Sequence, residues 1–289
     1  MKNVIIYNNC LRSKIIYQKY ISENDSDILG LVRVPNLSVN SENNLSPYLF
    51  KKFFKLPFCL QVYYFIQIVL YQIIDFFLNS GLQGVCKKKN IKHVYLPYIP
   101  TAKEIEKIFN ISENYFIFCS TSTILKKKHL NTNRIILNFH EGDLPNWRGV
   151  SINFHLLLHS QKYTATCIFQ PDLGIDTGKI VLKSNYFNIE GLSAFEILLL
   201  SLYSQSLLIF NVKNKKIKKF KSFRDNNDKN TYTFVNSHEI NKIKLSKKKI
   251  FNFSDYFFCL RMILCDSGHD LESLILKRLK YDFSKTKNI

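Results

Sequence analysis

The chain has 289 residues, of which 46% are hydrophobic and 14% aromatic, and its formal net charge is +19. The apolar content excludes a disordered chain, and the length suffices for one large domain with an appendage or for two modest domains. The charge admits nucleic acid, an anionic membrane surface or an acidic substrate as partner. Abundant Lys, Asn, Ile and Phe beside only 9 Gly and 7 Pro are typical of an AT-rich coding bias. We therefore interpret the densest basic run, at 213–221, as a solvated segment.

The seven cysteines form no CxxC pair and no Cys/His cluster at metal-ligand spacing. Several lie inside apolar runs, which predicts buried, reduced thiols in a cytoplasmic protein without a metal site. The apolar run at 4–7 is too short for a signal peptide and predicts a first strand.

Strand and helix patterns alternate along most of the chain. Strands are predicted over 4–7, 27–34, 93–97, 115–120, 134–139, 164–170 and 179–182, and helices over 14–21, 84–90, 101–109, 124–130 (a short helix or turn) and 193–210. Thr101 and Glu104 form a capping-box pair at the start of their helix. This alternation predicts an α/β fold with a mostly parallel sheet, helices on both faces, and chemistry at the carboxyl ends of the strands.

The pattern changes after about residue 210. We expect a catalytic domain over 1–210 and a small basic C-terminal segment over 211–289 whose end, 271–279, is helical.

The stretch 56–78 is apolar enough to suggest a membrane span. Gln61, Gln67, Gln72 and Asp75 argue against one, and three of them, without Gln67, share a helical face. We expect an apolar insertion at about 52–79 that forms a packed helix. Peripheral membrane contact and a true span are the alternatives.

The predicted fifth strand, 134–139, runs directly into the segment Asn138-Phe139-His140. Residues two apart in a strand point to the same side. An amide donor beside an imidazole suits acyl chemistry, because the amide can bind a developing oxyanion and the imidazole can stabilise it or move a proton.

Asp176 lies in the loop 172–178, between two glycines. Its carboxylate could orient His140 or accept a proton from an amine nucleophile. No Ser or Cys occupies a nucleophile elbow, which favours direct transfer over an acyl-enzyme route.

Three sequence elements occur in a specific order: Asn138-x-His140, then Leu144-Pro145-x-x-Arg148-Gly149, then Ile175-Asp176-Thr177-Gly178. Together they resemble the formyltransferase family, which includes methionyl-tRNA, glycinamide ribonucleotide and sugar N-formyltransferases and formyltetrahydrofolate hydrolase. The resemblance covers about 86–185, and 1–34 more loosely.

The resemblance implies a Rossmann-like domain with 10-formyltetrahydrofolate as the formyl donor. By this analogy, Asn138 holds the formyl oxygen, His140 stabilises the oxyanion, and Asp176 tunes His140 and helps remove the amine proton. Candidate folate-binding residues are Ser120, Thr121, Ile124, Leu125 and Gly174.

The chain departs from the family at Glu141 and Asp143, where members commonly carry a small residue and Ser-Leu. These acidic residues either contact a polar amine or sugar hydroxyls, or lie in an exposed loop. Together with Arg148 they are the candidate acceptor-binding residues.

The acceptor amine is inferred from what flanks the motifs. No glycine-rich phosphate loop follows the first strand, which disfavours glycinamide ribonucleotide, and the chain has no room before Val4 for the hydrolase's regulatory domain. Only about 65 residues follow 225, with a helical end, whereas the tRNA enzyme usually adds a basic β-barrel.

The expected acceptor is therefore a small-molecule amine, most simply a nucleotide-linked amino sugar, with methionyl-tRNA as the alternative. A non-catalytic folate-binding or membrane-surface scaffold is a third hypothesis. A homodimer is also compatible with the sequence.

Overall fold

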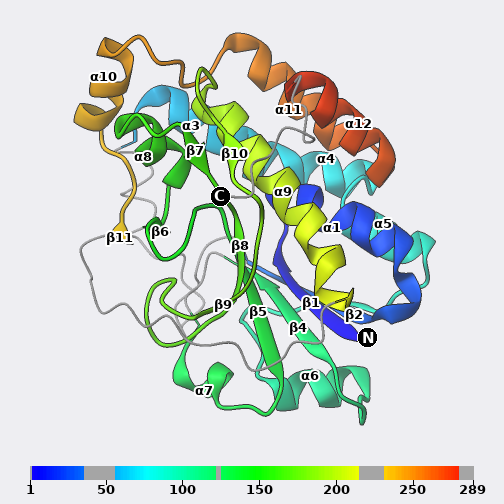
Figure 1. The fold of residues 1–289 in the computed structure, drawn as a ribbon. Helices are drawn as coiled ribbons and strands as arrows, with labels where there is room; N and C mark the ends of the chain where they lie inside the picture. The colour runs from blue at the N-terminus through cyan, green and yellow to red at the C-terminus, as the bar shows by residue number, and fades with distance from the viewer. Residues whose placement is uncertain (1, 36–55, 122–124, 215–230, 280–289) are drawn as a thin grey trace.

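The computed structural model describes residues 2–35, 56–121, 125–214 and 231–279. Its centre is a seven-stranded sheet in the order β3-β2-β1-β4-β5-β8-β9 (Figure 1). The strands are β1 (Asn3–Asn8), β2 (Ile28–Val34), β3 (His93–Tyr95), β4 (Phe116–Ser120), β5 (Ile135–His140), β8 (Cys167–Gln170) and β9 (Lys179–Lys183). The first five are parallel, and β8 and β9 are antiparallel to their neighbours. The predicted α/β fold with a mostly parallel sheet is confirmed.

Helices cover both faces of the sheet (Figure 1). One side carries α1 (Leu11–Glu23), α5 (Leu82–Lys88) and α9 (Ala194–Asn214), and the other carries α6 (Ala102–Phe109) and α7 (Lys127–Leu130). The buried β1 shows why: Ile5 and Tyr7 belong to the larger core, and Val4 and Ile6 to the smaller one. A strand that is buried on both faces has a continuous apolar sequence, as residues 4–7 do.

The capping box predicted at Thr101 is present: its hydroxyl accepts from the Glu104 N–H at 3.4 Å, and the Glu104 carboxylate accepts from the Thr101 N–H at 2.7 Å. The described cysteines are free thiols, most of them buried.

The predicted strand at 164–170 is divided into β7 (Tyr163–Thr164) and β8. Between them, the Thr166 N–H donates to the Ser184 hydroxyl at 3.0 Å, and the Thr166 hydroxyl donates to Ser204 of α9 at 3.0 Å. Side chains thus replace part of the strand ladder. β7 pairs with β10 (Phe187–Asn188) in a separate two-stranded sheet. The helix α8 (Ile152–Leu158) was not predicted.

The apolar stretch forms α3 (Phe58–Tyr64), the π-helix η2 (Phe65–Leu70) and α4 (Tyr71–Leu78). Asp75 is 4% exposed and accepts hydrogen bonds from Asn9 Nδ2 at 3.0 Å and the Gly81 N–H at 2.6 Å. These polar groups fix α4 to the loop after β1, so the stretch is helical and packs on the protein along this side of α4. Two segments, at 60–88 and 194–212, are long and apolar enough to cross a membrane, and their most apolar windows are 39% and 72% buried.

The C-terminal part contains α10 (Ser237–Leu245), α11 (Phe253–Leu264) and α12 (Gly268–Leu279), which confirms a helical end. Both α11 and α12 pack on α1. A Cβ at Gly268 would lie 2.5 Å from Lys19 Cα, so α12 needs a glycine at this approach. The fully buried Lys14 donates to the carbonyl of Ile263 at 2.6 Å and ties α1 to the end of α11. Residues 215–221 of the predicted basic run lie outside the described residues.

We predict that Asp75→Ala lowers the free energy of unfolding by about 2–4 kcal/mol, because two buried donors lose their acceptor. Asp75→Asn, which keeps an acceptor oxygen, should cost less. Urea unfolding of both variants measures the difference, and a loss below about 0.5 kcal/mol for the alanine variant would match an ordinary surface substitution and contradict the assigned role.

Burial lowers the pKa of Lys14 to about 8, against 10.5 for an exposed lysine. Between these two values Lys14 binds its proton more tightly in the unfolded chain, so its contribution to stability should rise as the pH increases through this window. Buried cysteines such as Cys86 and Cys167, whose pKa burial raises to about 12, contribute the opposite trend. We therefore expect urea unfolding between pH 8 and about 9.5 to show that the original chain gains stability relative to Lys14→Met, and a constant difference between the two would contradict the lowered pKa of Lys14.

Candidate active site

Asn138 and His140 occupy the carboxyl end of β5, the last parallel strand of the sheet. In register, Asn138 lies opposite Phe169 and His140 opposite Cys167 of β8. The Asn138 Oδ1 accepts from the N–H of Phe139 at 2.8 Å. This contact orients the amide so that its NH2 group, which has no hydrogen-bond partner within the described residues, is left to bind an incoming oxygen.

His140 is 5% exposed and is held on both sides. Its Nδ1 lies 3.3 Å from Asp176 Oδ2, and its Nε2 contacts the carbonyl oxygen of Trp147. Both partners are acceptors, and together they fix the orientation of the ring at the end of β5.

Asp176 has left-handed backbone geometry, with φ of +53°. Besides facing His140, its Oδ2 accepts from the N–H of Gly149 at 2.9 Å. Gly149 has φ of +97°, and a Cβ there would lie 2.1 Å from the carbonyl oxygen of Tyr232. At Gly178 a Cβ would lie 2.0 Å from the carbonyl oxygen of Gln170. Glycine at both positions is therefore required by close backbone approach.

The two acidic residues at which the sequence departs from the formyltransferase pattern are buried, at 9% exposure for Glu141 and 6% for Asp143, and do not lie in an exposed loop. Glu141 forms an ion pair with Arg12 of α1 at 2.9 Å. This ion pair joins the end of β5 to α1 and holds the Glu141 side chain in the protein interior.

Asp143 accepts hydrogen bonds from the Tyr186 hydroxyl at 2.8 Å and from Asn146 Nδ2 at 3.2 Å, and it pairs with Lys183. Burial lowers the pKa of Lys183, but its hydrogen bonds to Asp143 and Tyr186 outweigh burial and hold that pKa above its usual value. Asp143 is thus a neutralised, buried carboxylate at the edge of the site.

The other candidate residues fall in different surroundings. Arg148 is 2% exposed and lies in the short strand β6 (Arg148–Gly149), which pairs with β11 (Thr231–Tyr232). Ser120 ends β4 at 8% exposure, Thr121 follows it half-buried, and Leu125 belongs to the smaller core. Ile124 lies outside the described residues.

Gly174 lies in the loop of Asp176, where its N–H donates to Asp172 Oδ1 at 3.0 Å. The flanking Leu173 and Ile175 are 66% and 48% exposed. We did not single out this pair from the sequence. Apolar side chains on both sides of a glycine in a candidate site loop were the available signal.

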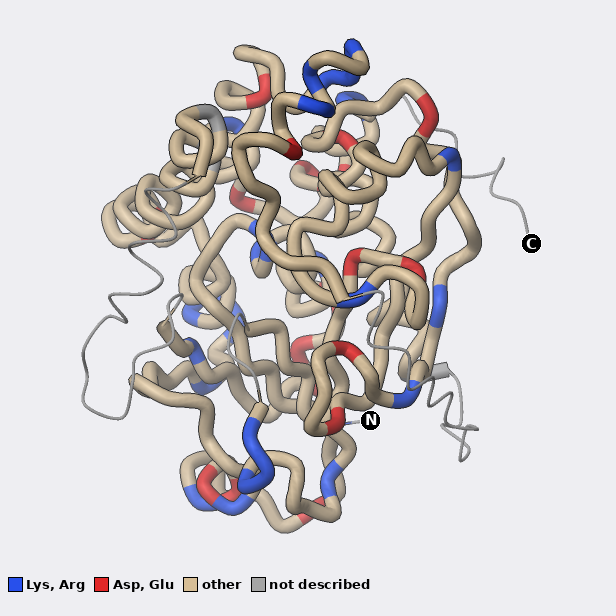
Figure 2. Tube along the Cα trace, turned by 90° about the vertical axis from the view of Figure 1, so that its left-hand side faces the viewer, with Lys and Arg blue, Asp and Glu red and all other residues tan. Residues whose placement is uncertain are grey.

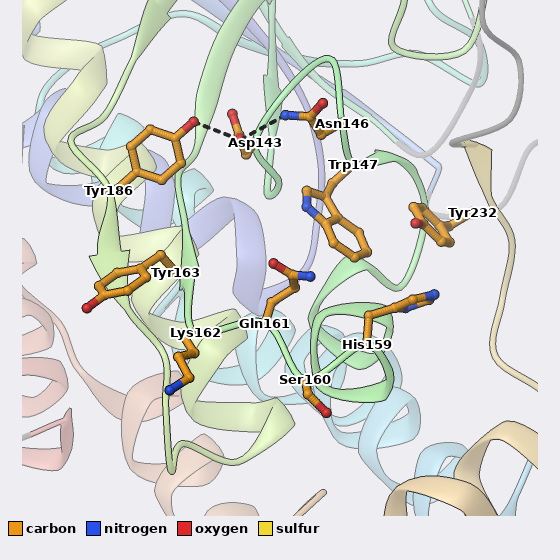
Figure 3. A pocket seen from close by; sticks show the side chains of 10 residues that line it. All are labelled: Asp143, Asn146, Trp147, His159, Ser160, Gln161, Lys162, Tyr163, Tyr186 and Tyr232. Atoms are coloured by element: carbon orange, nitrogen blue, oxygen red, sulfur yellow. Dashed lines mark hydrogen bonds between the residues drawn. The ribbon is translucent and has the colours of Figure 1, made fainter. Parts of the chain in front are cut away.

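An open cavity of about 720 Å³ borders the loop that follows β5 (Figure 3). It is lined by Asp143, Asn146, Trp147, His159, Ser160, Gln161, Lys162, Tyr163, Tyr186 and Tyr232. Trp147 stacks on Tyr232 with ring centroids 5.0 Å apart, and His159 meets the Trp147 ring edge-on at 5.5 Å. Most of this lining comes from 159–163 and from Tyr186 and Tyr232, which carry no motif, so the sequence did not reveal it.

Lys and Arg positions are spread along the described chain (Figure 2). Within the described ranges, no group of three His, Cys, Asp or Glu is arranged to hold a metal ion.

No protein-family model matches the chain. Its sequence is 31% identical over 113 residues to the methionyl-tRNA formyltransferase of Wolbachia pipientis, covering 39% of this chain and 38% of that protein. It is 33% identical over 108 residues to the methionyl-tRNA formyltransferase of Coxiella burnetii, covering 37% and 34%. The matched part of the chain thus spans little more than a third of the length of these curated relatives.

The fold is similar to that of two solved enzymes. The N-formyltransferase from Helicobacter canadensis, in complex with folinic acid and dTDP-3-aminofucose, gives a TM-score of 0.52 at 17% identity, covering 84% of this chain and 79% of that one. The sugar 3N-formyltransferase WlaRD, with dTDP and 5-N-formyl-THF, gives 0.51 at 18% identity, covering 87% and 83%. Part of the sequence is thus similar to formyltransferases, and the fold of most of the chain is similar to that of two N-formyltransferases.

Proposed function

We propose that this chain transfers a formyl group from 10-formyltetrahydrofolate to a primary amine. The observation that carries the proposal is the contact between His140 Nδ1 and Asp176 Oδ2, 3.3 Å long, beside the amide of Asn138 at the end of β5. An amide donor, an oriented imidazole and a carboxylate supply what direct acyl transfer to an amine needs.

Asn138 and His140 act on the formyl oxygen. The free NH2 group of Asn138 donates to this oxygen, and His140 faces the negative charge that develops on it when the amine nitrogen attacks the formyl carbon. Donors fixed in advance by a strand and a carboxylate need no reorganisation at that moment, which is why such groups contribute strongly to rate.

Asp176 accepts the proton that the attacking amine must lose, directly or through one water. The bond between the formyl carbon and N10 of the folate then breaks, and N10 takes up a proton. The products are a formamide and tetrahydrofolate, so no oxidant or metal enters the balance.

The surroundings of the triad fit a folate. Leu173 and Ile175 present exposed apolar surface beside Asp176, as a flat aromatic ring requires. Ser120 and Thr121, at the end of β4 next to β5, would bind its polar edge, and Gly174 would allow close backbone approach. Leu125 is 8% exposed in the smaller core and would support this wall from behind.

Asn138→Ala and His140→Ala should each lower kcat by about 10²–10³-fold, because the first removes a donor to the oxyanion and the second removes the imidazole that faces it. Asp176→Asn keeps an acceptor for the Gly149 N–H but removes the charge that faces His140, and should lower kcat at least as much. Mass spectrometry measures these effects by monitoring how fast the formamide forms from 10-formyltetrahydrofolate and candidate amines.

His238→Ala and Asn133→Ala, at exposed positions elsewhere, are the matched controls and should leave kcat unchanged. Full activity in folded Asn138→Ala and His140→Ala would refute the proposed mechanism.

We further propose that the acceptor is an amino sugar, most simply a nucleotide-linked one, bound in the cavity of Figure 3. The cavity borders the 143–147 loop, whose Trp147 carbonyl contacts His140, so its occupant would lie next to the triad. Its lining mixes aromatic rings with hydroxyl and amide groups, as a ligand carrying a ring and several hydroxyls requires. Among the candidate acceptor-binding residues, Asp143 borders this cavity, whereas Glu141 and Arg148 would position the loop from within the protein.

Gln161→Ala and Tyr163→Phe should raise the KM for a nucleotide-linked amino sugar by up to about tenfold each, the effect of one lost hydrogen bond. The KM for 10-formyltetrahydrofolate should not change. Steady-state kinetics with each substrate varied separately tests this expectation, with Tyr98→Phe as the control. An unchanged acceptor KM in both variants would remove the acceptor from this cavity.

Methionyl-tRNA is the second candidate acceptor, because the curated relatives quoted above are methionyl-tRNA formyltransferases. Here, however, the described part of the C-terminal region contains three helices, of which α11 and α12 pack on α1 and α10 packs on α8. Formylation of methionyl-tRNA, with binding that weakens steeply as salt rises, would favour this acceptor over the sugar. For either acceptor we propose a cytoplasmic enzyme.

A further inference from the structure

Two helical segments, the consecutive elements α3, η2 and α4 and the separate helix α11, each expose a row of large apolar side chains. Along α3, η2 and α4, Phe58, Phe65, Val69, Ile73 and Phe76 recur at spacings of seven, four, four and three residues and are 42–79% exposed. Such spacings place them on one helical face, with the neighbouring Phe77 73% exposed.

A second row lies on α11, where Phe253, Phe257 and Leu264 are 77%, 56% and 53% exposed. α11 contacts η2 and α4, and both α11 and η2 pack on α1 (Figure 1). Because both helices turn their buried sides toward the same core, their exposed rows point away from it and border one surface. We call these two rows the apolar face.

The exposed charges next to the two rows are mostly positive, with Asp266 beyond Leu264 as an exposed acidic residue. The acidic residues within the two rows, Asp75 and Asp255, are 4% and 1% exposed, and the latter pairs with Arg278. In contrast, Lys242, Lys244, Lys247 and Lys249, at the end of α10 and in the turn before Phe253, are exposed, and so is Arg261 between the apolar residues of α11. Leu245, in the middle of the lysines, is 84% exposed.

We propose that the apolar face binds the surface of an anionic lipid bilayer. Phenylalanine and leucine side chains would enter the boundary between headgroups and acyl chains, and the bordering lysines would contact anionic headgroups. A second copy of the chain fits less well, because its own lysines would face these lysines. Binding would be peripheral, since Tyr71 and Asp75 on the other side of α4 are buried against the protein.

The test is sedimentation of the full chain with vesicles of phosphatidylcholine alone or mixed with phosphatidylglycerol. We expect binding to the mixed vesicles only, weakened by salt. Two double variants, Phe76→Gln/Phe77→Gln and Phe253→Gln/Phe257→Gln, each remove one edge-to-face pair of rings. Each should weaken vesicle binding at least about tenfold, because moving a phenylalanine side chain from water into the bilayer interface is strongly favourable. Lys247→Gln/Lys249→Gln should weaken binding to mixed vesicles and reduce its salt dependence.

Tyr98→Gln is the matched control: its ring is 47% exposed on the loop before α6, away from the apolar face, and the variant should bind like the original chain. Thermal unfolding checks that every variant is folded, and formyl transfer in solution should be unchanged in all of them. Absence of vesicle binding would overturn the proposal, and so would binding that the phenylalanine variants leave intact. A dimer in sedimentation velocity that these variants dissociate, without vesicle binding, would assign the apolar face to self-association instead.

Discussion

The candidate active site depends on one carboxylate. Asp176 Oδ2 faces the ring of His140 and also accepts from the backbone N–H of Gly149, so one side chain links the end of β5, the loop after it and the loop between β8 and β9. The second contact fixes the carboxylate before it meets the imidazole. Charge-assisted hydrogen bonds of this kind are stronger and more directional than neutral ones. The orientation of His140 thus follows from backbone geometry that only glycine allows at Gly149.

The sheet places these pieces by its topology. β5 is the last parallel strand, and the antiparallel β8–β9 pair beside it returns the chain to the carboxyl end of β5. Asn138 and His140 come from the strand and Asp176 from the hairpin loop, so residues 36 positions apart share one edge. Ligands of open α/β sheets bind at such carboxyl ends. Helices packed from both sides hold that edge rigid, as a preorganised site requires.

The apolar insertion and the C-terminal helices are built into the same core as the strands that carry the candidate site. Asp75 joins α4 to the loop after β1, and Lys14 joins α1 to the end of α11. Each is a buried polar group with backbone or amide partners, a type of contact that fixes register more than it adds stability. The surface these helices turn outward, rich in phenylalanine and bordered by lysine, is therefore held at a fixed position relative to the active site, whatever it contacts.

The sequence by itself determined the alternation of strands and helices, the capped helix at Thr101, and the choice of Asn138, His140 and Asp176 as candidate site residues. These features are local, because periodicity, capping and motif order are carried by neighbouring residues. Only the tertiary structure decided that Glu141 turns inward to Arg12, that Asp143 is neutralised by Lys183, and that residues from 143 to 232 line one cavity. Each of these outcomes is a contact between segments far apart in the chain. Such contacts leave no pattern among neighbouring residues, so they cannot be predicted from local sequence.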